Sequence, residues 1–416
     1  MRTEKKTVAV IGAGLGGLCL AQGLRRAGIP FLVHERDAAA SPRAQGFRIR
    51  IDAAGQAALR ACLPESLMRL VEASASLGSS SGQMLDAQLQ AIRAEAPPSW
   101  HREAEANAEA ADDDTPRDLS LDRRVLREIL MAGIEPVVRF GQRLDGYRIG
   151  PDGRVQLEFE GGTRATCDVL VGADGVSSIV RRQLQPDATP EDSGTACVYG
   201  RADRSLVEGA APGAARLAQA TSVVLAEECA LILDDMIFRP ELRELAASCA
   251  PACSLNPPRD YFYWALLAPR QRIGIDPANP ELADGCRERL AGLAAHWHPA
   301  LRHLLLATPL DAISALPVRN GRPKLPVPPG PVTLLGDAAH AMSPAGGLGG
   351  GTAFQDARAL AGFLWRLAES SGSDHLAALA AYSLDLRERG SAAVERSRRA
   401  SETLLHRAGA SSSLQG

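Results

Sequence analysis

The chain is poor in aromatic residues, has no long apolar run and carries no large excess of either charge. Phe, Trp and Tyr make up 4% of its 416 residues, which disfavours the stacking surfaces that bind single-stranded nucleic acid. The formal net charge of −3 gives no electrostatic reason to expect a nucleic-acid partner or an anionic membrane. No segment approaches the roughly 20 consecutive apolar residues of a membrane-spanning helix. We therefore expect no membrane insertion.

The eight cysteines are scattered without a disulfide-like framework. Cys249 and Cys253 form the one close pair, and without a second pair they favour two reduced thiols over a metal site. Residues 1–6 are basic and residues 8–21 apolar, which imitates a secretory signal peptide, but the glycine density of the apolar part disfavours a signal helix. The sequence thus predicts a cytoplasmic protein that holds no metal.

A βαβ unit is predicted at the start of the chain. The β-branched residues 7–11 favour a strand, residues 15–27 have helical spacing and end at Gly28, and residues 31–33 begin a second strand. Such a unit places the first helix N-terminus at the carboxyl end of a parallel strand, where nucleotide phosphates bind.

The turn inside this unit carries the dinucleotide-binding fingerprint. Gly12 makes the tight turn, Gly14 lets the backbone approach a pyrophosphate, and Gly17 lets the helix pack closely on the strand. Glu35, at the end of the second strand, is an acceptor for adenosine ribose hydroxyls and would repel a 2′-phosphate. The motif predicts a dinucleotide site and by itself leaves both NAD and FAD open.

Two further glycine-rich turns follow buried strands. Asp174 lies in the segment GADG at 172–175, and Asp337 begins the segment DAAH that follows Gly336. An aspartate at such a turn accepts hydrogen bonds from sugar or ribityl hydroxyls, and the glycines at 346–351 let the backbone lie against a flat ring. A helix that begins near Gly351 favours negative charge at its N-terminus, which suits a reduced flavin.

The order of these three motifs resembles that of the class A flavoprotein monooxygenases, the aromatic hydroxylases typified by para-hydroxybenzoate hydroxylase. The resemblance covers roughly residues 1–75, 116–185 and 316–370. It implies FAD as cofactor and NAD(P)H as a transient electron donor without a domain of its own. One departure is the stretch GLGGG at 347–351, where relatives usually have GxGAN, so the contact of an asparagine side chain with the flavin is left to the backbone.

The resemblance also assigns arginines to the cofactor. Arg123 matches the family's RxxL helix start, and Arg48 or Arg50 matches its arginine-rich strand near the flavin phosphates. Together with the fingerprint, the predicted cofactor-binding residues are Gly12, Gly14, Leu15, Gly16, Gly17, Glu35, Arg36, Arg48, Arg123, Asp174, Gly175, Gly336, Asp337, Pro344, Gly347, Leu348, Gly349 and Gly350. No catalytic residue is nominated, because the flavin performs the difficult step.

The expected fold is α/β, with a Rossmann-like FAD-binding domain of the para-hydroxybenzoate hydroxylase type. We assign to it residues 1–75, 116–185 and 316–372. An inserted α+β substrate domain on a mixed β-sheet takes residues 76–115 and 186–315, and a C-terminal helical segment takes residues 373–416.

The function implied is NAD(P)H- and O2-dependent hydroxylation or epoxidation of a bulky organic substrate, with secondary metabolites favoured, through a flavin C4a-hydroperoxide. Two alternatives stay open: a flavoprotein of the same fold that cyclises, rearranges or dehydrogenates its substrate without inserting oxygen, and a plain NAD-binding module. The sequence leaves the substrate, the oligomeric state and the choice of NADH or NADPH undecided.

Several other residues invite a functional interpretation. His340 fits a proton relay, although packing within its turn is favoured. His296, His298 and His303 mimic metal ligands but favour a surface helix, and Ser177 and Ser178 favour a helix cap over a nucleophile. Tyr261, Tyr263 and Trp264 fit a substrate cavity and a core strand equally well.

Overall fold

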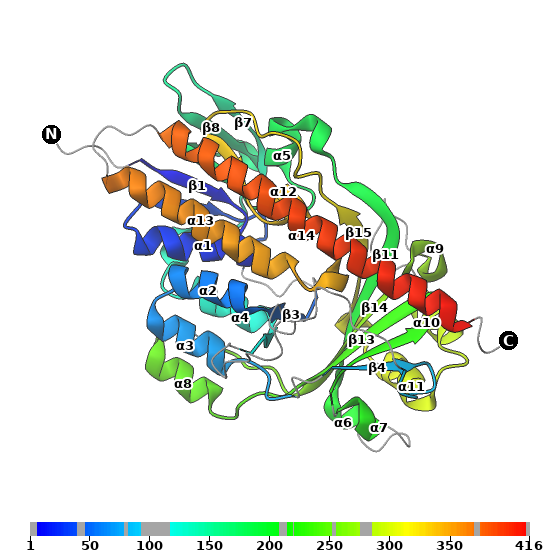
Figure 1. The fold of residues 1–416 in the computed structure, drawn as a ribbon. Helices are drawn as coiled ribbons and strands as arrows, with labels where there is room; N and C mark the ends of the chain where they lie inside the picture. The colour runs from blue at the N-terminus through cyan, green and yellow to red at the C-terminus, as the bar shows by residue number, and fades with distance from the viewer. Residues whose placement is uncertain are drawn as a thin grey trace, which may run out of the picture.

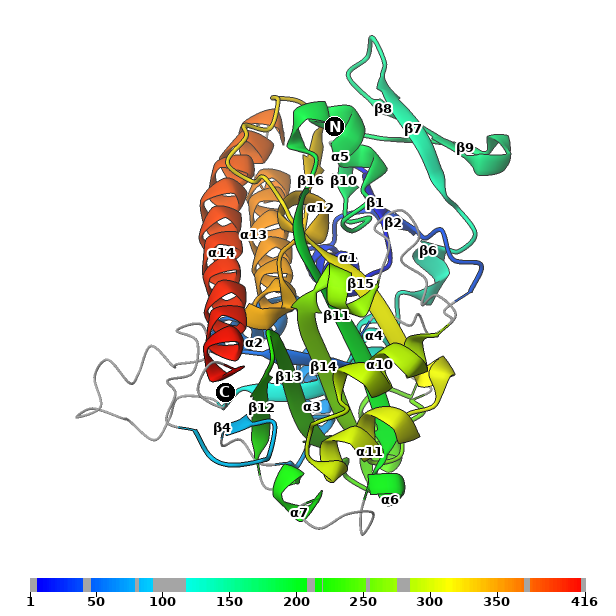
Figure 2. The same ribbon diagram turned by 90° about the vertical axis from the view of Figure 1, so that its right-hand side faces the viewer.

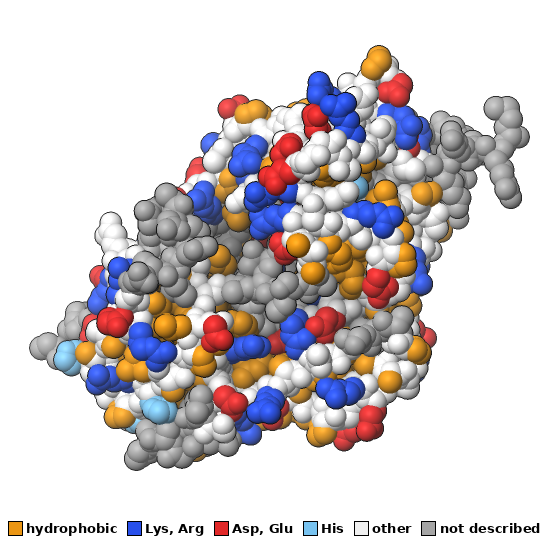
Figure 3. Space-filling model, turned by 180° about the vertical axis from the view of Figure 1, so that it is seen from behind, with side chains coloured by type: hydrophobic (Ala, Val, Ile, Leu, Met, Phe, Trp, Pro, Cys, Tyr) orange, Lys and Arg blue, Asp and Glu red, His pale blue; other side chains and the backbone are white. Residues whose placement is uncertain are grey.

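The computed structural model describes residues 6–39, 46–78, 82–92, 117–207, 214–218, 220–251, 255–274, 285–369 and 375–412. Three expectations concern residues outside these ranges: the basic start of the chain at 1–5, the part of the expected substrate domain at 93–115, and Cys253 of the close cysteine pair. Charged side chains of both signs are interspersed over the face drawn in Figure 3, as the balanced composition predicts. In the described part of the chain, none of the helices has a stretch long and apolar enough to span a membrane.

A five-stranded parallel sheet, in the order β16-β10-β1-β2-β6, forms the first half of the molecule (Figure 2). Its strands are β1 (Val8–Ile11), β2 (Phe31–His34), β6 (Val138–Arg139), β10 (Val169–Gly172) and β16 (Val332–Leu334). Because both faces are covered, the strands read as apolar runs, and β1 and β10 are buried throughout. The first helix, α1 (Leu15–Arg26), lies between β1 and β2 and packs on α13 (Gly349–Glu369) and α2 (Ala53–Cys62). The predicted βαβ unit is confirmed.

A six-stranded mixed sheet, in the order β15-β11-β14-β13-β12-β4, forms the second half. Its strands are β4 (Gly82–Asp86), β11 (Glu191–Asp203), β12 (Thr221–Ala226), β13 (Cys229–Met236), β14 (Tyr261–Pro269) and β15 (Ile313–Asn320). β4 runs parallel to β12, and the other neighbours are antiparallel. One face of this sheet packs on α10 (Cys286–Leu293) and α11 (Pro299–Ala307), and the other faces the parallel-sheet half and the C-terminal helix (Figure 2).

Two small sheets complete the strand structure. β3 (Arg48–Ile51) pairs with β5 (Leu119–Asp122); its Arg48 side chain reaches β13 of the second sheet, and its Ile49 side chain lies against the start of α13. A meander of β7 (Leu144–Ile149), β8 (Val155–Phe159) and β9 (Arg164–Cys167) projects from the first half. Gly150 and Gly153 favour a turn in the sequence, and the structure has a hairpin there between β7 and β8.

Two long helices close the chain. α13 begins close to the helix start expected near Gly351, and α14 (His375–Ser412) lies in the segment 373–416 expected to be helical. α14 runs antiparallel to α13 and then along the second sheet, where Ala400, Leu404 and Ala408 are buried (Figure 1). The remaining α-helices are α3 (Glu65–Ala73), α4 (Arg123–Met131), α5 (Ile179–Leu184), α6 (Arg204–Val207), α7 (Ala214–Leu217), α8 (Leu242–Cys249), α9 (Arg270–Ile273) and α12 (Asp337–His340).

Candidate cofactor and substrate site

The three glycines of the fingerprint have three different surroundings. Gly12 has a φ of +109°, and a Cβ on it would lie 2.4 Å from the Ala173 carbonyl oxygen. A Cβ on Gly17 would lie 2.2 Å from the Gly12 carbonyl oxygen, so α1 reaches the strand only because residue 17 has no side chain. Gly14 is extended, and a Cβ there would meet no atom of the described chain within 4 Å. The space over Gly14 therefore fits a phosphate group.

Glu35 fixes the same turn from the neighbouring strand. Its carboxylate is 2% exposed and accepts hydrogen bonds from the backbone N–H groups of Ala13 (2.8 Å) and Asp37 (3.0 Å). Arg36, the next residue, has an exposed side chain with its Nε 4.0 Å from the Asp37 carboxylate. The ribose-binding roles of Glu35 and Arg36 stay predictions, and the geometry adds a backbone-holding role for Glu35.

The GADG turn is tied to the start of α5. Asp174 Oδ2 accepts from the Ile179 N–H at 2.8 Å, and Ser178 Oγ accepts from the Arg181 N–H at 2.9 Å, which confirms the predicted cap. Asp174 Oδ1 is buried and has no hydrogen-bond partner among the described residues, and burial raises the pKa of this carboxyl. The buried Arg181 guanidinium donates to the Val176 and Ala338 carbonyls at 2.7 and 3.1 Å, so it links the second turn to the third.

Asp337 stands beside the glycine-rich start of α13. Gly336 has a φ of +62°, and the Asp337 side chain that follows is exposed and makes no hydrogen bond to the described residues. A Cβ on Gly349 would lie 4.0 Å from Asp337 Oδ1, so the two segments are adjacent. A Cβ on Gly350 would lie 2.3 Å from Ile49 Cδ1, which brings β3 against the first turn of α13. Asp337 is thus an open acceptor next to the partly exposed backbone of Gly349.

The predicted arginines lie between the two large sheets. Arg48 forms an ion pair with Asp234 of β13 (Nε–Oδ2 2.7 Å) and donates to Ser120 Oγ at 2.8 Å. Arg50, on the same side of β3, pairs with Asp118 at 2.7 Å. These pairs join β3 to its neighbours, and contacts of Arg48 and Arg50 with a cofactor remain predictions.

Sequence reasoning missed Arg127. Its Nε donates at 2.9 Å to the carbonyl of Ala13, inside the fingerprint turn. Arg127 follows Arg123 by one helical turn in α4, so both side chains lie on one side of the helix. This spacing from Arg123 was the sequence signal that could have indicated Arg127. Arg123 itself donates its backbone N–H to the Phe47 carbonyl at 2.8 Å.

Three tyrosines of the second sheet, Tyr199, Tyr261 and Tyr263, form a wall that faces β3 and α4. The rings of Tyr199 (β11) and Tyr263 (β14) lie 6.5 Å apart, and the Arg48 guanidinium is 5.9 Å from the Tyr263 ring. Tyr261 donates its hydroxyl to Asp122 Oδ2 at 3.0 Å. Trp264 lies on the opposite face, where its Nε1 donates to Thr308 Oγ1 at 2.9 Å. The strand alternation therefore divides the cluster: the tyrosines face the site, and Trp264 belongs to the helix-covered core.

The tyrosine hydroxyls of this wall are neutral. Burial raises the pKa of Tyr199 and Tyr263 well above the ordinary value of a phenol, and the neighbouring Cys197 thiol adds to this shift. Neutral phenols both donate and accept hydrogen bonds, so the wall suits hydroxyl and carbonyl groups of a ligand.

His340 is fully buried and is bonded to Asp356 of α13, with Nε2 and Oδ2 2.6 Å apart. His340 is therefore a packed residue, as the sequence favours. Its hydrogen-bond partner, however, is Asp356 of α13 and not a residue of its own turn. His298 caps α11 through Nδ1, which accepts from the Ala300 N–H at 3.2 Å. In the described ranges, no group of His, Cys, Asp and Glu has the arrangement of a metal site.

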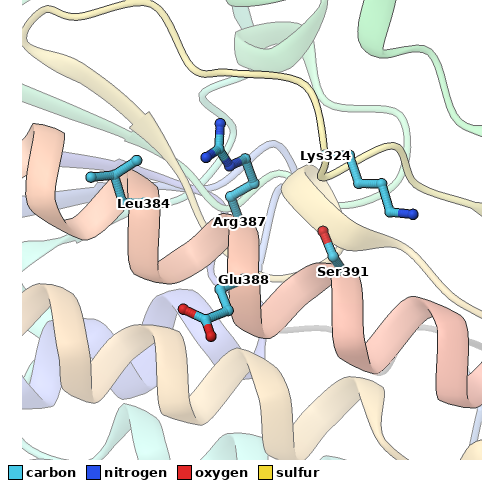
Figure 4. Close-up of a pocket in the computed structure, with 5 residues that line it drawn as sticks. All are labelled: Lys324, Leu384, Arg387, Glu388 and Ser391. Atoms are coloured by element: carbon cyan, nitrogen blue, oxygen red, sulfur yellow. The ribbon is translucent and has the colours of Figure 1, made fainter.

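A shallow hollow of about 380 Å³ lies on the outer surface of α14 (Figure 4). It is lined by Lys324, Leu384, Arg387, Glu388 and Ser391 and contains none of the predicted cofactor residues. The candidate site is therefore defined by the converging turns and not by this hollow.

The chain is similar to known FAD-binding proteins, in agreement with the predicted cofactor. A family model described as an FAD binding domain matches residues 252–397, which include Asp337 and the start of α13. The chain is 34% identical over 396 residues to a dual O-methyltransferase/FAD-dependent monooxygenase of Phaeosphaeria nodorum, with 88% of this chain and 41% of the relative covered. It is 28% identical over 408 residues to an FAD-dependent monooxygenase of Trichoderma harzianum, with 94% and 92% covered. The chain spans about two fifths of the length of the dual-function relatives.

Solved structures share the whole architecture. A protein of Photorhabdus luminescens described as an FAD-containing monooxygenase superposes with a TM-score of 0.78 at 26% identity, covering 97% of this chain and 99% of the other. The 2,6-dihydroxypyridine-3-hydroxylase of Arthrobacter nicotinovorans, at 19% identity, has the same fold with a TM-score of 0.72 and covers 97% and 93%. The predicted fold class is confirmed. The chain carries an FAD-binding domain and has the fold of the class A flavoprotein monooxygenases.

Proposed function

We propose that this chain is an FAD-dependent monooxygenase that uses NAD(P)H and O2 to oxygenate a bulky organic substrate. The observation that carries the proposal is the open acceptor at Asp337 beside the glycine-rich start of α13, together with the open space over Gly14. These features fit two neighbouring parts of FAD, because Gly14 leaves room for the pyrophosphate and Asp337 is an acceptor for the ribityl hydroxyls.

Bound FAD supplies the two-electron chemistry and the activation of O2. The chain's own residues hold and orient the reactants. Asp337 and Asp174 offer carboxylate acceptors, and the N-terminus of α13 stabilises negative charge near its first turn. The second sheet closes the site against water on the side of Tyr263, which is buried, and Tyr199, which is partly buried.

The wall of Tyr199, Tyr261 and Tyr263 supports a planar, oxygen-bearing substrate. Two tyrosine rings suit stacking against a flat ring system, and their neutral hydroxyls suit its hydroxyl or carbonyl groups. Arg48, whose guanidinium lies 5.9 Å from the Tyr263 ring, is already paired with Asp234, so it supplies no free positive charge for a carboxylate. This arrangement fits a secondary metabolite such as an aromatic polyketide better than a small anionic phenol. It also supports the assignment of residues 186–315 to the substrate domain.

The test is substrate-dependent oxygen consumption. Purified protein reconstituted with FAD is mixed with NADH or NADPH and a panel of aromatic polyketides, with small benzoates as the comparison set. The proposal expects a substrate that stimulates NAD(P)H oxidation and gains one oxygen atom from ¹⁸O2, as measured by mass spectrometry. Conversion without ¹⁸O incorporation and without NAD(P)H consumption would instead establish the cyclase or isomerase alternative. Absence of bound FAD after reconstitution would overturn both.

A further inference from the structure

A buried cluster of charged side chains lies behind the turn that presents Asp337. Asp356, on α13, is fully buried and accepts at Oδ2 from the Gly336 N–H (3.0 Å) and from the His340 ring (2.6 Å). Its other oxygen accepts from Arg389 Nε of α14 at 2.9 Å. Arg389 also donates to Asp385 at 2.6 Å. One carboxylate thus joins three segments that are distant in sequence.

These bonds act on the backbone that orients Asp337. Gly336 has a φ of +62° and a ψ of −141°, a conformation that a glycine adopts and that its N–H bond to Asp356 fixes. Asp337 makes no side-chain hydrogen bond to the described residues, so the direction of its carboxylate depends on this backbone. Loss of the Asp356 charge would free the turn and leave the buried His340 without its partner.

The C-terminal helix is fitted to this cluster at two places. A Cβ on Gly390 would lie 3.0 Å from His340 Cδ2, so α14 lies directly against the imidazole ring. Two turns further along, Ser397 Oγ donates to the Ser343 carbonyl, and a Cβ on Gly346 would lie 3.1 Å from Ser397 Oγ. α14 therefore supports both segments that flank the expected flavin site.

We propose that Asp356, held by Arg389, is a positioning residue for FAD that couples the docking of α14 to the affinity of the cofactor site. The inference rests on the assignment of FAD to this site. It assigns to the C-terminal helix a role in cofactor retention beyond the stability of the fold. Because coupling is reciprocal, bound FAD should in turn strengthen the contact of α14 with the turn.

The test compares Asp356→Asn and Arg389→Met with Arg398→Met as the matched control. Arg398 lies on the same helix and forms exposed ion pairs with Glu395 and Glu402, so its variant loses surface pairs only. FAD affinity is measured by flavin fluorescence on titration of each apoprotein. We expect FAD binding to weaken about tenfold or more in the two cluster variants, and to stay within about twofold of wild type in the control. Arg389→Lys should recover part of the loss, because it restores a positive charge next to Asp356.

A second measurement separates positioning from stability. Each protein is melted with and without saturating FAD, and the FAD-induced rise in Tm is compared with that of wild type. A purely structural role lowers both melting temperatures and leaves this rise unchanged, which would overturn the inference. Hydrogen exchange should also show α14 amides near Arg389 gaining protection when FAD is added to wild type. Wild-type protein without FAD binding would refute the cofactor assignment itself, whereas variants that bind FAD like wild type would refute only the coupling.

Discussion

Gly14→Val and Gly17→Ala form a pair that separates cofactor binding from folding. Gly14 has a φ of −74° and a ψ of 176°, which a valine adopts easily, and its Cβ would meet nothing within 4 Å. Gly17 is three residues away in the same motif, yet its Cβ would lie 2.2 Å from the Gly12 carbonyl oxygen. Gly14→Val should therefore impair FAD binding and leave the fold intact, whereas Gly17→Ala should destabilise the fold.

The magnitudes follow from these contacts. Valine at the N-cap position of α1 costs the apoprotein at most about 1 kcal/mol. A methyl group forced against the Gly12 carbonyl costs about 1–3 kcal/mol or more, because α1 has to move off the strand. For FAD, the valine occupies the space that the pyrophosphate requires. We expect a loss of affinity of about a hundredfold, which corresponds to about 2.7 kcal/mol.

The assay is thermal unfolding of each apoprotein together with FAD titration by fluorescence. We expect Gly14→Val to melt near wild type and bind FAD very weakly, and Gly17→Ala to melt at a clearly lower temperature. If Gly14→Val retained FAD at wild-type affinity, the pyrophosphate would not lie over Gly14 and the dinucleotide site would be misassigned. If it melted as low as Gly17→Ala, the open space at residue 14 would be wrong.

Three further outcomes are expected. Asp337→Ala removes an exposed carboxylate acceptor and should weaken FAD about ten- to a hundredfold, with a paler purified protein that regains colour in excess FAD; an unchanged FAD content would contradict its role. Glu35→Gln keeps an acceptor oxygen for the turn but loses the charge, so FAD should weaken while apoprotein stability, measured by urea unfolding, falls by about 1–2 kcal/mol at most. Burial by itself would lower the pKa of His340, but the charges of Asp356 and Asp337 outweigh burial and raise this pKa. Protonated His340 therefore stabilises the fold fully below the unfolded pKa of about 6.5, and this stabilisation is lost as the pH rises through the folded pKa. The Tm difference between wild type and His340→Gln should therefore shrink from pH 6 to pH 9, and a difference that grows would refute this sign.

The turns of the candidate cofactor site could be predicted from sequence, because their chemistry is local. Gly12 and Gly17 are required because a side chain at either position would collide with the backbone of an adjacent strand or turn. The strand after Gly28, the hairpin at 150–153 and the cap by Ser178 likewise depend on residues a few positions apart. The resemblance to the flavoprotein fold was also visible in the sequence, because it rests on the order of three such local motifs.

The tertiary structure decided everything that depends on contacts between distant segments. No local pattern indicates that Arg48 pairs with Asp234, or that Asp356 and Arg389 meet behind the Gly336 turn. Two neighbouring aromatic residues of β14 illustrate the limit. Strand alternation shows that Tyr263 and Trp264 face opposite sides of the sheet, but only the packing of α11 on one side decides which of them faces the parallel-sheet half. A sequence determines the conformations that each short segment prefers, whereas the partners of a buried charge depend on how the whole chain closes around it.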